Sequence, residues 1–412
     1  MPKKVFFVNS LKYIIVSGAS KGFNYVVLLY LAIGAFSEQY VAILLLLSLE
    51  QLLSLLLPLN NSHIIYSKTI TTYEFITNKL ISSSLIVLII YVLLFFLTKQ
   101  IAYAYFEVKT LIVYLCLFTS MIINAYMAYL TNYYKLIEEH DKALLIQALL
   151  FISFVSIIIS IIFIDNKIIA FFVGKAGGLL IALLLVKILK LNKFKFKFVV
   201  LTLDEFKKMI NLFSISVLGW VSGLGFMNLA KIYSTSEELV KVGYIINLCN
   251  VFLLISIGIN SIYNPLIKKY FLAGDYKNTI GTRIKTLFIY LSIAGMAFLV
   301  FLLLNNVFPF DWNLKAKDIL LVFPFTIVIF IFNSFQSVAQ PFYMINEKFK
   351  TYNIINLAAY FAWGLIMVVC LYLGYNNFVL FLLLLHFFKG LFSYSYVIKF
   401  LNSNDYSKIN RE

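Results

Sequence analysis

The chain has 412 residues, of which 62% are hydrophobic and only 13% are charged, and its mean hydropathy is +0.93. Soluble domains hold about 45 to 50% apolar residues, so this composition excludes a soluble globular protein and predicts a polytopic membrane protein. The formal net charge is +16, but the lysines flank apolar runs, where they orient helices and meet anionic lipid. We therefore expect membrane lipids, and no nucleic acid, among the partners.

Twelve apolar stretches are long enough to cross a bilayer, which takes about 20 residues. They lack the short alternating segments of barrel strands, so we expect an all-α fold with about twelve transmembrane helices. The predicted spans lie near residues 9–32, 41–62, 80–98, 110–131, 143–164, 168–187, 209–230, 240–263, 286–307, 318–338, 353–374 and 377–398.

Two lysines interrupt the first span and point to opposite sides of the predicted helix, which turns about 100° per residue. Lys12 lies near the start of the span on an apolar face, where its stem can extend to the headgroups, so we interpret it as an interfacial anchor. Lys21 lies about half way through, on a polar stripe with Ser17 and Asn24. A charge at that depth favours a watery interior and a functional role over helix packing. Lys21 also makes a cleaved signal peptide implausible, so we expect a retained first span.

Glu50 is the one acidic residue inside the second span. Spans 1 and 2 are expected to be antiparallel neighbours, and counting along both helices places Glu50 at about the depth of Lys21. We predict that they pair. Two interpretations stay open: a fixed ion pair that holds two helices, or a carboxylate whose protonation accompanies transport.

The sixth span contains Lys175 beside Gly174, Gly177 and Gly178. Such small residues allow two membrane helices to pack closely. Lys175 can either face an interior site or extend outward to the interface, and the sequence does not decide between the two.

A basic segment follows the sixth span and reads KILKLNKFKFKFVVLTLDEFKK from Lys187 to Lys208. We predict an N-terminal lobe over 1–189, a cytoplasmic linker over 190–208 that rests on anionic lipid, and a C-terminal lobe with a short tail over 209–412. The pairs Ser37-Glu38 and Ser236-Glu237 lie 199 positions apart at corresponding spans. This constant spacing suggests two six-helix lobes related by a pseudo-twofold axis.

The twelfth span repeats the pattern of a deep cation on a polar face. His386, Lys389 and Ser393 share one side of the predicted helix. We expect Lys389 and His386 to contribute to an interior site.

The distribution of Lys and Arg predicts the topology. If the N-terminus is cytoplasmic, the inner segments hold 23 of these residues and the outer segments hold 7. Cytoplasmic loops carry the excess of positive charge, so we expect both termini in the cytoplasm.

Motifs of catalysis and metal binding are missing from the sequence. There is no phosphate-binding Gly-rich loop with Lys-Ser/Thr, no His-Glu-x-x-His and no Gly-x-Ser-x-Gly. We expect no enzyme, no metal and no cofactor, since the histidines and cysteines stand in separate segments: His63, His140 and His386, and Cys116, Cys249 and Cys370.

Twelve helices in two halves, with deep cations and no motor, predict a secondary transporter whose site lies between the lobes. The chain also resembles the Wzx-type polysaccharide flippases of the multidrug/oligosaccharidyl-lipid/polysaccharide exporter superfamily. The resemblance rests on LKYIIVSGASKGFNYVVLLYLAIGAFSEQYVAILLLLSLEQLLSLLL at the start, the loop after span 4, and NPLIKKYFLAGDYKN after span 8.

The resemblance implies a V-shaped pair of lobes with a central cavity, which open alternately and carry undecaprenyl-pyrophosphate-linked oligosaccharide outward for O-antigen or capsule synthesis. It implies a monomer in the bacterial cytoplasmic (inner) membrane, with a polysaccharide polymerase and a chain-length regulator as partners. Lys21 fits the basic cavity of such relatives. Span 7 has Asn228 and Lys231 where some relatives carry an acid, so coupling to H⁺ or Na⁺ stays open.

Three alternatives remain. A small-molecule antiporter of the same superfamily favours an acidic cavity for organic cations, whereas the deep residues here are mostly basic. A membrane-embedded polysaccharide polymerase or ligase generally carries a long outer loop, whereas the outer loops here are short. A structural scaffold gains nothing from the buried charges of Lys21, Glu50 and Lys389.

Overall fold

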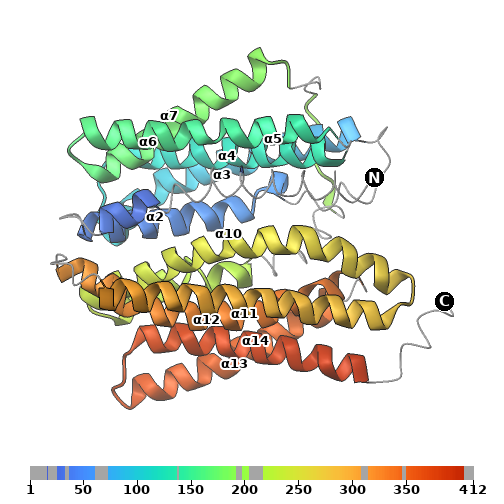
Figure 1. Cartoon of the computed structure of the whole chain (residues 1–412). Helices are drawn as coiled ribbons and strands as arrows, with labels where there is room; N and C mark the ends of the chain where they lie inside the picture. The colour runs from blue at the N-terminus through green and yellow to red at the C-terminus, as the bar shows by residue number, and fades with distance from the viewer. Residues whose placement is uncertain are drawn as a thin grey trace. The chain divides into compact units, whose positions relative to one another are not determined.

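The computed structural model describes residues 16, 26–32, 37–60, 73–136, 139–191, 197–203, 217–307, 314–345 and 349–402. Within these ranges all regular secondary structure is helical (Figure 1). The predicted all-α fold is confirmed.

The helices that follow position the candidate residues. Their bounds are α2 Ser37–Leu55, the 3₁₀ helix η1 Pro58–Asn60, α3 Tyr73–Phe106, α4 Leu111–Leu136, α5 His140–Leu149, α6 Phe151–Phe163, α7 Lys167–Ile188, α9 Phe226–Tyr233, α10 Ser236–Leu272, α11 Tyr276–Val307, α12 Leu314–Ile345, α13 Phe349–Tyr372 and α14 Phe378–Asn402.

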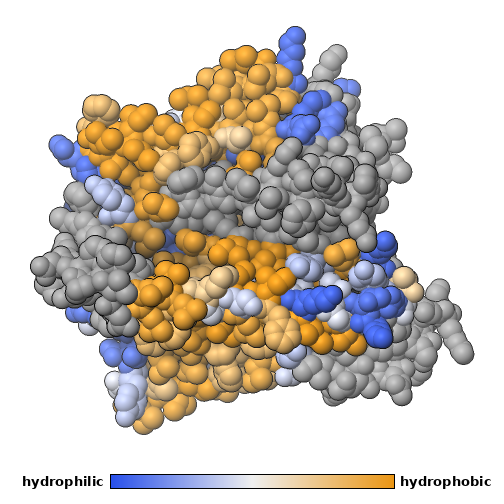
Figure 2. Space-filling view, in the orientation of Figure 1, coloured by the Kyte–Doolittle hydropathy of each residue, from blue (hydrophilic) through white to orange (hydrophobic). Residues whose placement is uncertain are grey.

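Eight stretches of described helix are long and apolar enough to cross a membrane. They coincide with eight of the predicted spans, those of α3, α4, α5 with α6, α7, α11, α12, α13 and α14. Apolar side chains cover much of the face that Figure 2 shows. In the most apolar stretch of α11 and of α13 only 17% of residues are buried, against 50% in α7 and α14. The helices that carry Lys175 and Lys389 are therefore interior helices of the protein.

The second predicted span is shorter than expected. The sequence pattern extends to residue 62, but α2 ends at Leu55 and the chain continues through turns into the 3₁₀ helix that starts at Pro58. Proline lacks the N–H that an α-helix needs at that position and clashes with the preceding turn, so it ends the helix.

The seventh predicted span is a broken helix, not a continuous one. A turn over 222–225 separates a short helical stretch from α9. The carbonyl of Trp220 accepts from the N–H groups of Gly223 and Gly225 at 3.0 and 2.9 Å. A Cβ at Gly225 would lie 2.7 Å from the Trp220 ring, so the glycine allows the indole to fold back over the turn.

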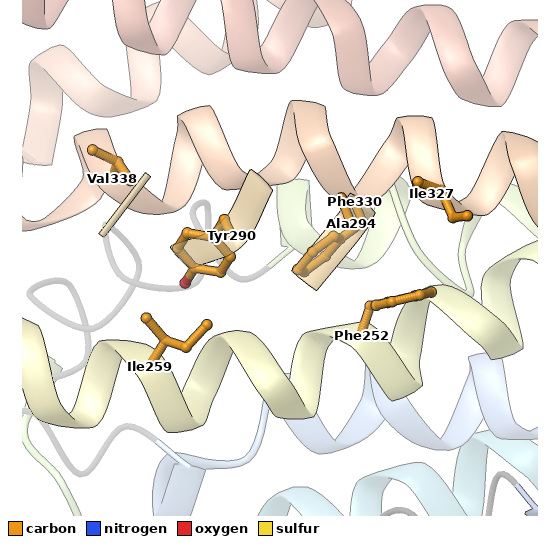
Figure 3. Packing of buried hydrophobic residues seen from close by; sticks show 7 residues of the cluster. All are labelled: Phe252, Ile259, Tyr290, Ala294, Ile327, Phe330 and Val338. Atoms are coloured by element: carbon orange, nitrogen blue, oxygen red, sulfur yellow. The ribbon is translucent and has the colours of Figure 1, made fainter. Parts of the chain in front are cut away.

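The chain divides into two compact units. The first contains the described residues from Val16 to Asn228 and the second those from Leu229 onward. The core of the second unit is a cluster from three helices: Phe252 and Ile259 of α10, Tyr290 and Ala294 of α11, and Ile327, Phe330 and Val338 of α12 (Figure 3). The domain boundaries predicted at 189 and 208 stay predictions.

The same polar contact occurs once in each unit. Gln39 at the start of α2 accepts a hydrogen bond from the N–H of Lys167, the first residue of α7, at 2.9 Å. In the second unit Glu238 at the start of α10 accepts from the N–H of Phe378, the first residue of α14, at 2.5 Å. Gln39 and Glu238 are 199 positions apart, the spacing already seen in the sequence. This contact supports the predicted relation between the two halves.

Two glycines set the distance between α6 and α7. A Cβ at Gly174 would lie 2.7 Å from the Cα of Ile157, and a Cβ at Gly178 would lie 2.4 Å from the Cα of Ser153. Gly177 has nothing within 4 Å of its hypothetical Cβ. The close packing predicted around Lys175 is confirmed, and it depends on the Gly174 and Gly178 face.

Gly178→Ala should therefore destabilise the protein. The added methyl group meets backbone, which cannot rotate away, and overpacking of this kind costs roughly 1 to 3 kcal/mol. Gly177→Ala is the matched control and should be neutral or slightly stabilising, because alanine favours helix. Thermal unfolding of the purified protein in detergent measures both. Equal melting temperatures for the two variants would contradict the assigned packing face.

The topology stays a prediction that reporter fusions can check. Fusions after Lys142, Lys190 and Asp275 should all report cytoplasm, since positive charge gathers in these segments. A periplasmic signal after Lys190 would require an odd number of spans in the first half and would overturn the two-lobe arrangement.

Candidate functional site

Glu50 and Lys175 form an ion pair inside the first unit. Lys175 Nζ lies 2.8 Å from Oε1 and 2.6 Å from Oε2 of Glu50. The side chains are only 12% and 8% exposed, and the pair joins α7 to α2. Both charges lie where water is scarce, so each depends on the other for compensation.

This pairing corrects one prediction. Glu50 was expected to pair with Lys21, which lies outside the described residues, whereas Lys175 holds both carboxylate oxygens. Counting residues gives the depth of a side chain but does not tell which helices are neighbours. The outward-pointing alternative for Lys175 is also excluded by its burial against Glu50.

A second polar cluster surrounds Ser48, two residues before Glu50 on α2. The indole N–H of Trp220 donates to the Ser48 carbonyl at 2.9 Å, and the amide of Asn228 donates to the Ser48 hydroxyl at 2.7 Å. The Tyr105 hydroxyl donates to Asn228 Oδ1 at 3.0 Å. The cluster thus connects both sides of the break in the seventh span to α2 and α3.

Sequence reasoning noted Asn228 only as the replacement of an acid and missed the other members of the Ser48 cluster. The two glycines after Trp220 were the available signal, since Ser-Gly-Leu-Gly inside an apolar run indicates a break. Irregular backbone at membrane depth occurs where protein or a watery cavity satisfies it. The Ser48 cluster supplies that satisfaction for the first unit.

The second unit holds the polar face of α14. His386 Nδ1 lies 2.7 Å from Asn333 Oδ1 on α12, and because an amide oxygen only accepts, Nδ1 carries the proton. Lys389 Nζ lies 5.8 Å from the centre of the Tyr360 ring on α13, within cation–π distance. His386 and Lys389 are 7% and 6% exposed, and Ser393 is fully buried.

These contacts show how α14 presents two polar side chains to two different helices. Gly390 lets α14 approach α12 closely, because a Cβ there would lie 2.6 Å from the carbonyl oxygen of Phe332. The structure brings His386 and Lys389 into one buried region of the second unit, as the sequence predicts. It brings Glu50 and Lys175 together in the first unit. Ser17, Lys21 and Asn24 lie outside the described residues.

Groups able to hold a metal ion were sought among the described residues. No set of three or more His, Cys, Asp or Glu side chains comes close enough in those ranges. The chemistry available in the described clusters is that of charge pairing and hydrogen bonding, through Lys175, Glu50, Lys389 and His386.

The fold is that of the MATE transporters of the MOP superfamily. An outward-facing multidrug resistance MATE family transporter of this superfamily aligns with a TM-score of 0.67 at 12% identity, over 98% of this chain and 97% of the other. A eukaryotic MATE transporter aligns with a TM-score of 0.62 at 14% identity, again over 98% and 97%.

A third similar structure is a MOP superfamily transporter from Pyrococcus furiosus, with a TM-score of 0.59 at 11% identity over 96% of both chains. It is described as having a binding pocket of reverse polarity that suggests a different function. No protein-family model and no curated protein matches the chain in sequence.

Proposed function

We propose that the protein is a secondary transporter that flips undecaprenyl-pyrophosphate-linked oligosaccharide repeat units from the inner to the outer leaflet by alternating access. The observation that carries the proposal is the placement of lysines on the interior helices: Lys175 on α7 and Lys389 on α14 are both buried. The transporter fold favours this class of function over the membrane-embedded polymerase or ligase.

The pyrophosphate group explains why deep lysines are useful. Its negative charge loses hydration when it enters the hydrocarbon slab, and ammonium groups in a hydrated cavity replace that hydration by charge attraction and hydrogen bonds. Lys389 and His386 offer donors in the second unit, and Lys21, with Ser17 and Asn24, is the predicted contribution of span 1. The polyprenyl tail stays in the bilayer.

Lys175 has a different place in this proposal because Glu50 neutralises it. A substrate phosphate competes with the carboxylate for Lys175 Nζ, and protonation of Glu50 releases the ammonium for the substrate. This makes H⁺ the coupling ion that the pair favours, with Na⁺ as the alternative. No cofactor is needed for either scheme.

The proposed setting is the bacterial inner membrane, with both termini in the cytoplasm and a monomeric transporter. A polysaccharide polymerase and a chain-length regulator would act on the translocated units. The glycan, whether O-antigen, capsule or another polymer, is not specified by the described residues.

A small-molecule antiporter is the second candidate, because multidrug transporters share the fold. The polarity of the buried charges separates the two. An exporter of organic cations needs an acidic interior, whereas the described buried groups include Lys175, Lys389 and one carboxylate, Glu50, that is already paired.

Deletion of the gene followed by mass analysis of lipid extracts tests the proposal. The mutant should accumulate single lipid-linked repeat units in the inner leaflet, and a plasmid copy should remove them. Normal levels of lipid-linked units, together with increased sensitivity to cationic drugs, would favour the antiporter instead.

A further inference from the structure

The chain that follows α7 is tied along the start of α3. We call residues 197–203 the strap. Three alternate N–H groups of the strap donate to polar side chains of α3: Lys197 to Asn78 at 2.9 Å, Val199 to Ser82 at 3.2 Å and Leu201 to Ser83 at 3.0 Å. Alternate residues of an extended chain are about 6.6 Å apart, close to the pitch of about 5.4 Å of a helix, so the two periods match at Asn78 and Ser82.

The strap lies near the end of both helices that hold it. The 22 residues of α7 cover about 33 Å, enough to cross the hydrocarbon core before α7 ends at Ile188. Lys190 ends the helix with a φ of +53°, and the Tyr134 hydroxyl of α4 donates to the carbonyl of Leu191 at 2.6 Å. The attached part of α3 is the polar beginning of a helix of 34 residues, longer than the core requires. These positions place the strap at the membrane–water interface.

Its exposed side chains are of two kinds. The lysines at 187, 190 and 197 are exposed, and beside them Ile188, Phe198 and Leu203 are 70%, 65% and 70% exposed. The sequence from 187 to 203 contains five lysines and no acidic residue. Exposed aromatic and aliphatic groups among lysines suit neither water nor hydrocarbon alone, but they suit the headgroup layer of an anionic membrane.

We propose that the end of α7 and the strap form an interfacial binding site for anionic phospholipid. The apolar side chains enter the acyl boundary, and the lysines bind headgroup phosphates. The hydrogen bonds to α3 satisfy the backbone at that depth and fix the direction in which Phe198 points. This site lies outside the clusters assigned to the oligosaccharide carrier and goes beyond the proposed function.

A fluorescent probe on the full chain tests the depth. Phe198→Cys is labelled in a variant whose three native cysteines are replaced, and the protein is reconstituted in phosphatidylcholine vesicles with or without phosphatidylglycerol. Lipids with a shallow nitroxide should quench the probe, and aqueous iodide should not. Lys277→Cys, an exposed position at the start of α11, is the control and should be quenched by iodide. Quenching of the probe at 198 by iodide, or by neither agent, would overturn the proposal, as expected of a solvated loop or of a surface covered by a soluble protein.

A second measurement tests the headgroup. Replacing Lys187, Lys190 and Lys197 with Gln should lower the enrichment of phosphatidylglycerol in co-purified lipid by roughly tenfold or more, given the attraction of each lysine to an anionic surface. The matched control replaces three exposed lysines on the hairpin of α10 and α11, Lys269, Lys277 and Lys285, and should change the enrichment far less. Equal enrichment in both triple variants would show that the segment contacts lipid without selecting its charge. Neither measurement depends on transport, so each can fail while the flippase proposal stands.

Discussion

Glu50→Gln should strongly destabilise the protein, and Lys175→Gln should do the same. Each change leaves one buried group without its counter-charge, since the partners are 2.6 Å apart and about nine-tenths buried. Breaking a buried ion pair from one side costs about 3 to 5 kcal/mol. Thermal unfolding in detergent at neutral pH measures the loss.

The double variant Glu50→Gln with Lys175→Gln should recover much of the stability, because no uncompensated charge remains. The exposed pair of Glu237 and Lys241, whose atoms are 2.7 Å apart with Glu237 77% exposed, provides the control. Its disruption by Glu237→Gln should change stability by at most about 1 kcal/mol. Strictly additive effects at Glu50 and Lys175 would refute an energetic contact between them.

The same variants separate a structural pair from a coupling pair. If the pair only joins α2 to α7, the double variant should regain transport together with stability. If Glu50 must take up a proton during the cycle, the double variant should be stable but inactive, and transport should lose its dependence on the proton gradient. Flux in proteoliposomes with an imposed pH gradient distinguishes the two.

Much of the fold was predictable because hydrophobic length is a strong signal. A bilayer requires about 20 apolar residues per span, and eight described helices satisfy that requirement where the sequence placed them. The errors have local causes. Pro58 shortens α2, and the glycines around 222–225 break span 7, since a hydropathy window averages over single residues that end a helix.

The candidate site was predictable only in part. Depth and helical face identified Lys175, Lys389 and His386 as interior groups, and the structure buries all three. Partners were not predictable, because the order of spans does not fix which helices touch. Glu50 therefore met Lys175 rather than the predicted Lys21, and Asn228 entered a cluster with Ser48 that periodicity alone does not indicate.

Lys389→Ala should sharply reduce surface polysaccharide at unchanged protein level. Lys389 is buried on α14 against the Tyr360 ring, where its charge is costly unless it serves the substrate or the fold. Losing one partner of a buried charged contact costs about 2 to 5 kcal/mol, so display should fall by about tenfold or more. Lys21→Ala should act in the same direction, and Lys12→Ala should be tolerated as the loss of an interfacial anchor.

Two further substitutions decide whether charge or packing is the reason. Lys389→Met keeps the apolar stem and removes the charge, whereas Lys389→Arg keeps the charge and changes the donor geometry. If Lys389 receives the pyrophosphate, Met should abolish display and Arg should retain part of it. Lys277→Ala, at an exposed position, controls for general effects of losing a lysine. Surface display is measured against immunoblotted protein, and normal display from Lys389→Met would return this lysine to a role in packing α14 against α13.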